Sequence, residues 1–215
     1  MPRGRFITVE GLDGAGKTTV VGGLAATLRQ RGQDVAVLRE PGGVELSERI
    51  RALVKDPALD VHPRAEALLY AAARAQLVAE RLEPLLADGR WVLLDRFVDS
   101  SLAYQGAGRG LGVEEIRELN AFATGGLAPD RTLLLRIEPA EGLARAAARP
   151  EDADRLEREA LAFFAAIGAA YDALAAAEPE RFAVIDAAQP PDAVLAACVR
   201  AVAPLLQPGS TDHRG

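Results

Sequence analysis

The sequence predicts an α/β fold in which a parallel five-stranded sheet carries helices on both faces. Three observations lead to this prediction. Five short apolar runs recur along the chain, they show little polar alternation, and longer segments with helical spacing separate them. Strands of this kind are buried on both faces, and parallel neighbours need a crossover that is usually a helix. Because such sheets bind ligands at the carboxyl ends of their strands, the residues after each strand are the candidate site residues.

The predicted strands are short runs of apolar, aromatic and β-branched residues. The first run combines aromatic and β-branched residues, and the fourth contains three consecutive leucines. In chain order the five runs are Arg5–Glu10, Val35–Leu38, Trp91–Leu94, Thr132–Ile137 and Phe182–Ile185.

The predicted helices show apolar residues at helical spacing or are rich in alanine and leucine. Glycine follows two of them as a stop signal, at Gly32 and Gly89. Pro84 should bend the third helix or break off its last turn. The helical segments are Thr18–Arg31, Glu45–Val54, Arg64–Asp88, Glu114–Ala123, Leu156–Ala177 and Asp192–Leu206.

Length and composition indicate one domain, residues 1–206, followed by a flexible tail, residues 207–215. The formal net charge is −6, and it argues against a nucleic acid polymer as partner, because such binding requires a basic surface. The single cysteine, Cys198, excludes an internal disulfide bond. No apolar run reaches the ~18 residues of a membrane span. The chain starts without a signal-peptide pattern, so we expect a cytoplasmic protein without a membrane partner.

The most informative stretch, GLDGAGKTT, follows the first predicted strand and opens the first predicted helix. It matches the phosphate-binding pattern G-x-x-x-x-G-K-[ST]. Its backbone N–H groups and the helix N-terminus should form a cradle for nucleotide phosphates, with Lys17 on the β- and γ-phosphates and the Thr18 hydroxyl on Mg²⁺. The predicted nucleotide-binding residues are Gly11, Leu12, Asp13, Gly14, Ala15, Gly16, Lys17, Thr18 and Thr19.

Polar residues follow the second and third predicted strands. Asp95 can approach the metal through water or hydrogen-bond to Thr18, and Arg96 beside it can bind a phosphate with two nitrogens. The alternative for Asp95 and Arg96 is a purely structural role, as a helix cap next to a surface arginine. Arg39 and the rigid Pro41 come after the second strand and can bring charge and backbone close to a ligand, unless they form an ordinary tight turn.

Several segments, in this order and spacing, resemble the thymidylate kinase family, whose members phosphorylate dTMP to dTDP. The segments are VEGLDGAGKTT, LREPGG, YAAAR, LLDRFVDSSLAYQGAGRG and DRLE, and the resemblance covers about Arg5 to Leu206. It implies the P-loop NTPase fold of nucleoside monophosphate kinases, ATP and Mg²⁺ as cofactors, dTMP as substrate and a homodimer.

The resemblance also implies roles for individual residues on the dTMP side. Asp13 matches the residue that binds the deoxyribose 3′-hydroxyl, and Tyr70 matches an aromatic that stacks on thymine and is often phenylalanine. Arg74 matches the arginine that donates to thymine O4, so that the amino group of cytosine would meet another donor. Ser100 and Ser101 match residues near the base edge. Tyr104, beside Gln105, matches the residue that disfavours ribose. The segment Arg145–Arg155 matches a mobile lid that closes over ATP.

Members of this family keep their catalytic arginine in the phosphate-binding loop or in the lid. The loop here has Gly14-Ala15 and no arginine, which resembles the bacterial type with the arginine in the lid. Lys17, Arg96, Arg149 and Arg155 are therefore the catalytic candidates, and which lid arginine touches the phosphoryl group stays open. Two alternatives also stay open: a kinase for another nucleoside monophosphate, and a P-loop regulator without phosphotransfer. A GTPase of the latter kind should carry N-K-x-D, which this sequence lacks.

Overall fold

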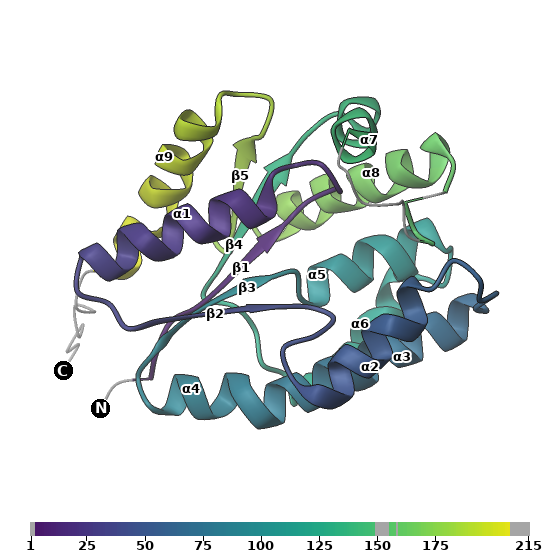
Figure 1. Ribbon diagram of the computed structural model, residues 1–215, viewed down its shortest axis with the longest axis horizontal. Helices are drawn as coiled ribbons and strands as arrows, with labels where there is room; N and C mark the ends of the chain where they lie inside the picture. Colours follow the sequence, from purple (N-terminus) through teal and green to yellow (C-terminus); the bar gives the residue numbers. More distant parts are fainter. Residues whose placement is uncertain (1–2, 149–154, 158, 207–215) are drawn as a thin grey trace.

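The computed structural model describes residues 3–148, 155–157 and 159–206. Five strands form one parallel sheet with the order β2-β3-β1-β4-β5. The strands are β1 (Phe6–Glu10), β2 (Val35–Arg39), β3 (Trp91–Asp95), β4 (Arg131–Arg136) and β5 (Phe182–Asp186). The predicted fold class is confirmed, and each predicted strand lies within one residue of its predicted bounds. Figure 1 shows the sheet at the centre of the molecule, between layers of helices.

The helices cover both faces of this sheet, as the apolar strands predicted. Helices α1 and α9 pack together over one face, whereas the π-helical segment η1 and α4 pack under β2 and β3 on the other. The α-helices are α1 (Lys17–Gln30), α2 (Glu45–Lys55), α3 (Pro63–Leu77), α4 (Glu83–Ala87), α5 (Val98–Ser101), α6 (Val113–Thr124), α7 (Pro139–Ala147), α8 (Leu161–Ala177) and α9 (Pro191–Val202). The π-helical segments are η1 (Val78–Leu82) and η2 (Leu102–Gly108), and η3 (Ala203–Leu206) is a 3₁₀ helix.

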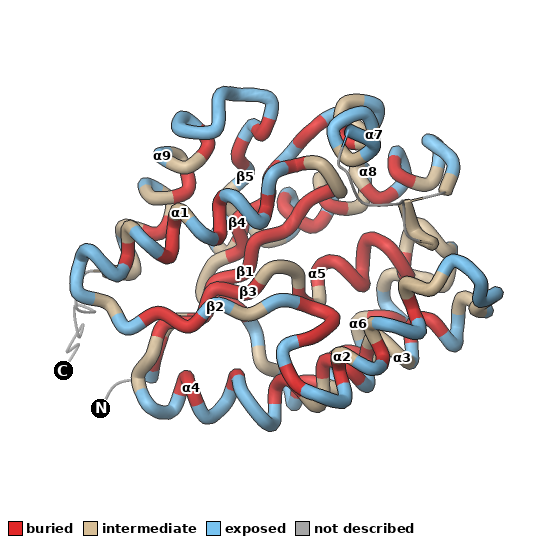
Figure 2. The backbone as a smooth tube through the Cα atoms, viewed as in Figure 1, coloured by how far each residue is buried: buried red, intermediate tan, exposed pale blue. Residues whose placement is uncertain are grey.

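The central strands β1, β3 and β4 are deeply buried and mostly red in Figure 2, whereas the edge strands β2 and β5 also carry exposed residues. Alternate residues of β3 face opposite cores: Leu93 packs with α1, while Val92 and Leu94 pack with η1 and α4. All three are fully shielded from solvent. No described helix combines the length and the apolar character that crossing a membrane would require.

The long helix predicted at Arg64–Asp88 differs from the observed one around Pro84. Rather than ending, the helix widens into η1, where the Glu83 N–H donates to Val78 O, five residues back. A proline lacks this donor and its ring collides with the carbonyl four residues earlier, which here belongs to Glu80. The wider π turn changes the position of that carbonyl, so the helix continues through α4.

One further predicted helix was wrong at its start, and three helical segments were missed. The last long helix begins at Leu161, not Leu156, because residues 155–157 form a turn that contacts α2 and α3. Helices α5 and α7 and segment η2 were not predicted. They are short, and Gly106 and Gly108 interrupt the helical pattern of η2.

The core on both faces of the sheet predicts how strongly a shortened side chain lowers the stability of the protein. Leu93→Ala should lower the free energy of unfolding by about 2–5 kcal/mol, because the fully buried side chain leaves a cavity in the central sheet. The same change at Leu161, which is 51% exposed, should cost less than about 0.5 kcal/mol. Urea unfolding of both variants measures the difference, and equal losses would contradict the core assigned to β3.

Candidate active site

The predicted phosphate-binding loop joins β1 to α1 at the carboxyl edge of the sheet. Gly14 and Gly16 adopt positive φ angles of 80° and 89°, a conformation that residues with a Cβ atom rarely adopt. A Cβ atom on Gly14 would also lie 2.1 Å from the carbonyl oxygen of Gly142 in α7. Glycine is therefore required there for the loop to curl and to pack against α7.

Lys17, the first residue of α1, is held by the loop itself. Its Nζ donates to the carbonyl oxygens of Gly11 at 3.1 Å and Leu12 at 2.9 Å, and lies 3.9 Å from Asp13 Oδ1. Burial and the nearby Arg96 lower the pKa of Lys17 to about 8, against the opposing effect of Asp13 and other carboxylates. The ammonium group is thus positioned at the loop before any phosphate arrives.

Thr18 and Asp95 form the oxygen pair that was predicted to bind Mg²⁺. The Thr18 hydroxyl donates to Asp95 Oδ2 at 3.4 Å, across the junction between α1 and β3. Asp95 Oδ1 is buried and has no hydrogen-bond partner among the described residues. A free carboxylate oxygen next to a hydroxyl fits the all-oxygen coordination that Mg²⁺ prefers.

Arg96 links the loop after β3 to the phosphate-binding loop. Its φ of 69° is unusual for a residue with a side chain, so the surrounding contacts must hold the backbone there. Nη2 donates to Asp13 Oδ1 at 2.8 Å and to the Tyr104 hydroxyl at 3.2 Å, while Nη1 donates to Ser100 Oγ at 3.1 Å. The guanidinium also lies over the Tyr104 ring, 5.0 Å from its centroid.

Asp13 stays ionised because of this arginine. Burial alone would raise its pKa, but Arg96 and Lys17 together hold the pKa of the carboxyl well below its usual range. The Tyr104 hydroxyl donates to Asp13 Oδ2 at 3.1 Å. Burial raises the pKa of Tyr104 above its ordinary value, so this phenol remains a donor at neutral pH.

Arg74 is almost fully buried and the protein engages each of its nitrogen atoms. Nε and Nη2 pair with Glu40 Oε2 at 2.7 Å, and Nη2 donates to Phe97 O at 2.9 Å. Nη1 donates to Ser101 Oγ at 2.9 Å and to Asn120 Oδ1. The resemblance implied a direct contact of Arg74 with thymine O4, whereas here its N–H groups already have protein acceptors. Glu40 Oε1 is buried without a partner among the described residues, and burial raises the pKa of this carboxyl.

These groups line one cavity of about 500 Å³ at the carboxyl edge of the sheet. The register places Val9 and Arg39 beside Asp95 on either side of β3, which explains why loops far apart in sequence meet there. The predicted residues that line it are Asp13, Gly14, Gly16, Lys17, Thr18, Thr19, Arg39, Pro41, Tyr70, Arg74, Asp95, Arg96, Ser100, Ser101, Tyr104 and Gln105. Gly11, Leu12 and Ala15 were also predicted as nucleotide-binding, but they are not lining residues.

Sequence reasoning missed several lining residues. They are Glu40, Arg51, Lys55, Leu156 and Glu157. Arg51 donates from α2 to Pro41 O at 3.0 Å, so it supports the loop after β2 as well as adding charge. Lys55 had a signal in the sequence, because it is one of only two lysines in the chain.

The lid arginines have different positions. Arg155 donates through Nε to Val54 O at 3.0 Å and pairs with Glu66 of α3, and it does not line the cavity. Arg149 lies outside the described residues. Arg145, at the base of the lid, donates to Ala187 O at 2.9 Å. Among the described lid arginines, therefore, Arg155 anchors the end of the lid segment to α2 and α3.

Comparisons with known proteins agree with this geometry. The family model described as thymidylate kinase matches residues 9–197. A thymidylate kinase of Deinococcus radiodurans is 53% identical over 192 residues, covering 89% of this chain and 93% of that protein. A thymidylate kinase of Lactobacillus delbrueckii subsp. bulgaricus is 49% identical, covering 93% and 96%. The crystal structure of thymidylate kinase from Ehrlichia chaffeensis superposes with a TM-score of 0.75 at 29% identity, covering 93% of this chain and 98% of that one.

The buried pair between Arg74 and Glu40 predicts a strong effect on stability. Arg74→Met should lower the free energy of unfolding by about 3–5 kcal/mol, because it leaves the Glu40 carboxylate buried without its counter-charge. Adding Glu40→Gln should recover part of that loss, since the second change removes the unpaired charge. Thermal and urea unfolding of the single and double variants test this, and additive losses would show that the pair is not coupled.

Proposed function

The chain belongs to the thymidylate kinase family and transfers a phosphoryl group from ATP to dTMP, and we propose how its residues divide this work. One observation carries the proposal: a single cavity brings the phosphate-binding loop together with Arg96, Tyr70 and Tyr104. A donor and an acceptor nucleotide can meet end to end in such a cavity.

On the ATP side, the loop from Gly11 to Thr19 binds the phosphates through its backbone N–H groups and the N-terminus of α1. Lys17 moves its ammonium group from the carbonyls of Gly11 and Leu12 to the β- and γ-phosphate oxygens. Thr18 and Asp95 would hold Mg²⁺, which would supply positive charge to the ATP phosphates. The pairing of these two oxygens supports this assignment.

On the dTMP side, Arg39 and Arg96 bind the acceptor phosphate, and the loop at Pro41 approaches it with its backbone. Asp13 accepts the deoxyribose 3′-hydroxyl, while Tyr104 stands against the position of a ribose 2′-hydroxyl. The thymine ring stacks on Tyr70, with the side chains at its edge coming from Arg74, Ser100, Ser101 and Gln105. Arg74 reaches O4 when the base replaces one of its protein acceptors.

The transfer needs positioning and positive charge more than covalent chemistry. Phosphoryl transfer passes through a loose transition state with charge spread over the oxygens of the moving group. The dTMP phosphate is already an anion, so no strong general base is required. Arg96, held in place by Asp13, and Lys17, after its move to the phosphate oxygens, stabilise this charge. Arg149 is the lid arginine that we assign to the moving phosphoryl group, and Arg155 anchors the lid through Glu66.

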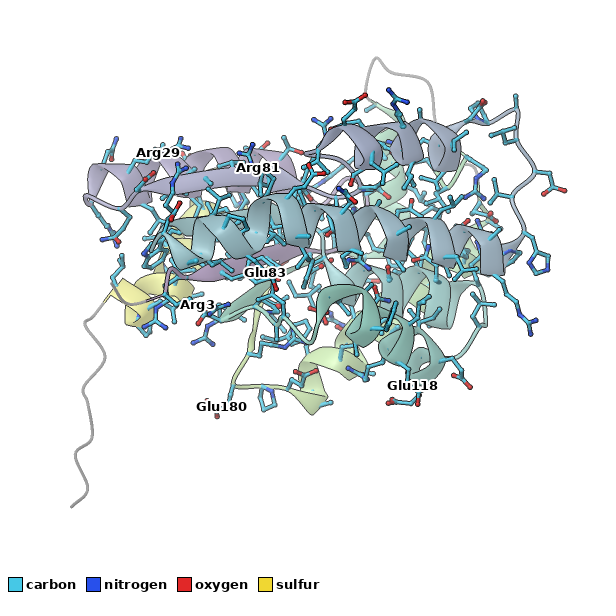
Figure 3. All side chains as sticks on the ribbon, turned by 90° about the horizontal axis from the view of Figure 1, so that it is seen from below. Arg3, Arg29, Arg81, Glu83, Glu118 and Glu180 are labelled. Carbon is cyan, nitrogen blue, oxygen red and sulfur yellow. The ribbon has the colours of Figure 1, made fainter. Side chains whose placement is uncertain are left out.

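A homodimer fits the outer helical layer. Helices α2, α3 and α6 pack side by side, and Figure 3 views the molecule from this side, with Glu118 of α6 labelled. The layer exposes several large apolar side chains, including Phe122 of α6, which is 91% exposed. The others are Leu46, Leu53 and Leu68. We propose that a second copy covers this face. The cytoplasmic location also stays a prediction, consistent with a single, unpaired Cys198.

Lys17→Met tests the function together with a panel of acceptors. We expect wild-type protein to form ADP from ATP and Mg²⁺ only when dTMP is added, with much lower turnover on dCMP, dGMP or the ribonucleotide UMP. Lys17→Met should lower kcat about 100-fold or more, because the fixed charge on the transferring phosphoryl group is lost. ADP formation that does not depend on dTMP, or unchanged turnover in the variant, would reject the proposal. Arg200→Met, which removes an exposed positive charge on α9 away from the cavity, is the control and should keep wild-type turnover.

Light scattering tests the dimer. Wild-type protein should have a measured mass of twice its chain mass of 22.7 kDa. Phe122→Glu should raise the dissociation constant of the dimer at least about tenfold, because it places a charge in an apolar contact. Leu161→Glu, on α8 outside this face, should leave the mass unchanged. A wild-type protein that is monomeric at every concentration would refute the dimer.

A further inference from the structure

Glu10 is a buried carboxylate with no part in the proposed function. It is the last residue of β1, directly before the phosphate-binding loop, and its side chain is fully shielded from solvent. Oε1 accepts from the Phe97 N–H at 2.7 Å. Oε2 accepts from Ser100 Oγ at 2.6 Å and from the Tyr171 hydroxyl at 2.9 Å. These three donors come from the loop after β3, from α5 and from α8.

We propose that Glu10 is a positioning residue for Arg96, acting through the Ser100 hydroxyl and the Phe97 amide. The proposal rests on the role given above to Arg96, which binds the dTMP phosphate and stabilises the transferring phosphoryl group. Glu10 does not contact a substrate itself.

The first connection runs through the backbone. Arg96 has a φ of 69°, and such a conformation persists only where neighbouring contacts fix it. The Phe97 N–H belongs to the peptide unit that follows Arg96 directly, and Glu10 holds that N–H from β1. A second backbone contact, from Arg96 N–H to Val9 O at 3.0 Å, holds the other side of the same residue.

The second connection sets the direction of a hydroxyl group. An ionised carboxylate can only accept, so Ser100 must direct its O–H to Glu10 and keep an oxygen lone pair for Arg96 Nη1, 3.1 Å away. The Tyr171 hydroxyl, whose oxygen lies 2.9 Å from Ser100 Oγ, likewise donates its own O–H to Glu10 Oε2. Because Tyr171 belongs to α8, the helix after the lid segment, the cluster joins that helix to the arginine at the reaction centre.

The charges around Glu10 place its ionisation near neutral pH. Burial and, next, the charge of Asp99 raise the pKa of Glu10 to about 7, against the lowering effect of Ser100, Arg96 and Tyr171. Lys17 also lies within the field of this carboxylate. Asp99 itself pairs with Arg181 at 2.6 Å and accepts from Thr132 at 3.3 Å. Glu10 is thus ionised above pH 7 and becomes protonated as the pH falls below it.

Glu10→Gln is the main test, because glutamine keeps the shape and the acceptor for Phe97 but presents an N–H group to Ser100. At pH 8 we expect kcat to fall about 10- to 100-fold and KM for dTMP to rise, because Arg96 loses its orientation, while KM for ATP is unchanged. Tyr171→Phe should change the same constants in the same direction, by a smaller factor. Glu180→Gln, an exposed carboxylate after α8 that lies outside the cavity and outside the face of α2, α3 and α6, is the matched control and should behave as wild type.

A double-mutant cycle separates positioning from a purely structural role. If Glu10 acts through Arg96, adding Glu10→Gln to Arg96→Lys should lower kcat less than about twofold further. A full, multiplicative loss in the double variant would overturn the proposal. So would a Glu10→Gln variant whose KM for dTMP stays at the wild-type value, because a merely destabilised protein loses active molecules and not affinity.

The pH profile gives a second, independent readout. At saturating substrates, the kcat of the wild type should fall as the pH drops through about 7, which gives the pH profile an acid limb. The Glu10→Gln variant should lack this acid limb, and its kcat should stay low at every pH. Asp99→Asn should move the limb to lower pH, because it removes the charge that raises the pKa of Glu10. An identical acid limb in Glu10→Gln would overturn the proposal. Wild-type turnover in Arg96→Lys would overturn the role of Arg96 and, with it, the role of Glu10. A defective Arg96→Lys variant together with a normal Glu10→Gln variant would overturn the role of Glu10 alone.

Discussion

The ion pair between Arg96 and Asp13, 2.8 Å long, is the contact on which the site depends. It joins the loop after β3 to the phosphate-binding loop after β1, two neighbouring strands whose register brings Val9 beside Asp95. Without Arg96, the more distant Lys17 would be the remaining counter-charge of Asp13, and the carboxylate would repel the phosphates more strongly. With Arg96, the carboxylate is paired and can take the role proposed for it, as acceptor for a sugar hydroxyl, while the cradle keeps its positive character.

The same arrangement recurs away from the phosphates, where buried carboxylates hold arginines in place. Glu40 pairs with Arg74, and Glu66 pairs with Arg109 and Arg155 while also accepting from Gln105. A buried charge is costly unless a partner and further hydrogen bonds satisfy it, so each pair fixes the geometry of both members. The donors around the cavity therefore need little rearrangement when charge develops in the transition state, which is the condition for strong electrostatic stabilisation.

The strands, the main helices and the phosphate-binding loop could be predicted from sequence because their signals are local. A run such as Trp91–Leu94 or a spacing such as Gly11 to Thr18 is complete within a few residues. Glu10, Glu40 and Glu66 could not be predicted, because nothing beside them distinguishes a buried glutamate from an exposed one. Their partners lie far away in the chain, as Glu66 and Arg109 do, separated by 43 residues. The π-helical turn before Pro84 was missed because the sequence shows the proline but not the wider turn that accommodates it.

The pairing of carboxylates with arginines also explains how a chain with a net charge of −6 can bind two polyanionic nucleotides. Glu48 pairs with Arg39 at the rim, and Asp99 pairs with Arg181 behind the sheet, so many acidic groups are balanced within the protein. The lining of the cavity, by contrast, has more cationic side chains than carboxylates. The six cationic residues are Lys17, Arg39, Arg51, Lys55, Arg74 and Arg96, and the four carboxylates are Asp13, Glu40, Asp95 and Glu157. The local field there is positive although the chain is acidic. The pairing of carboxylates with arginines inside the protein determines the charge of the cavity and thus the ligands that it binds. The net charge is a sum over the whole chain and does not show this local difference.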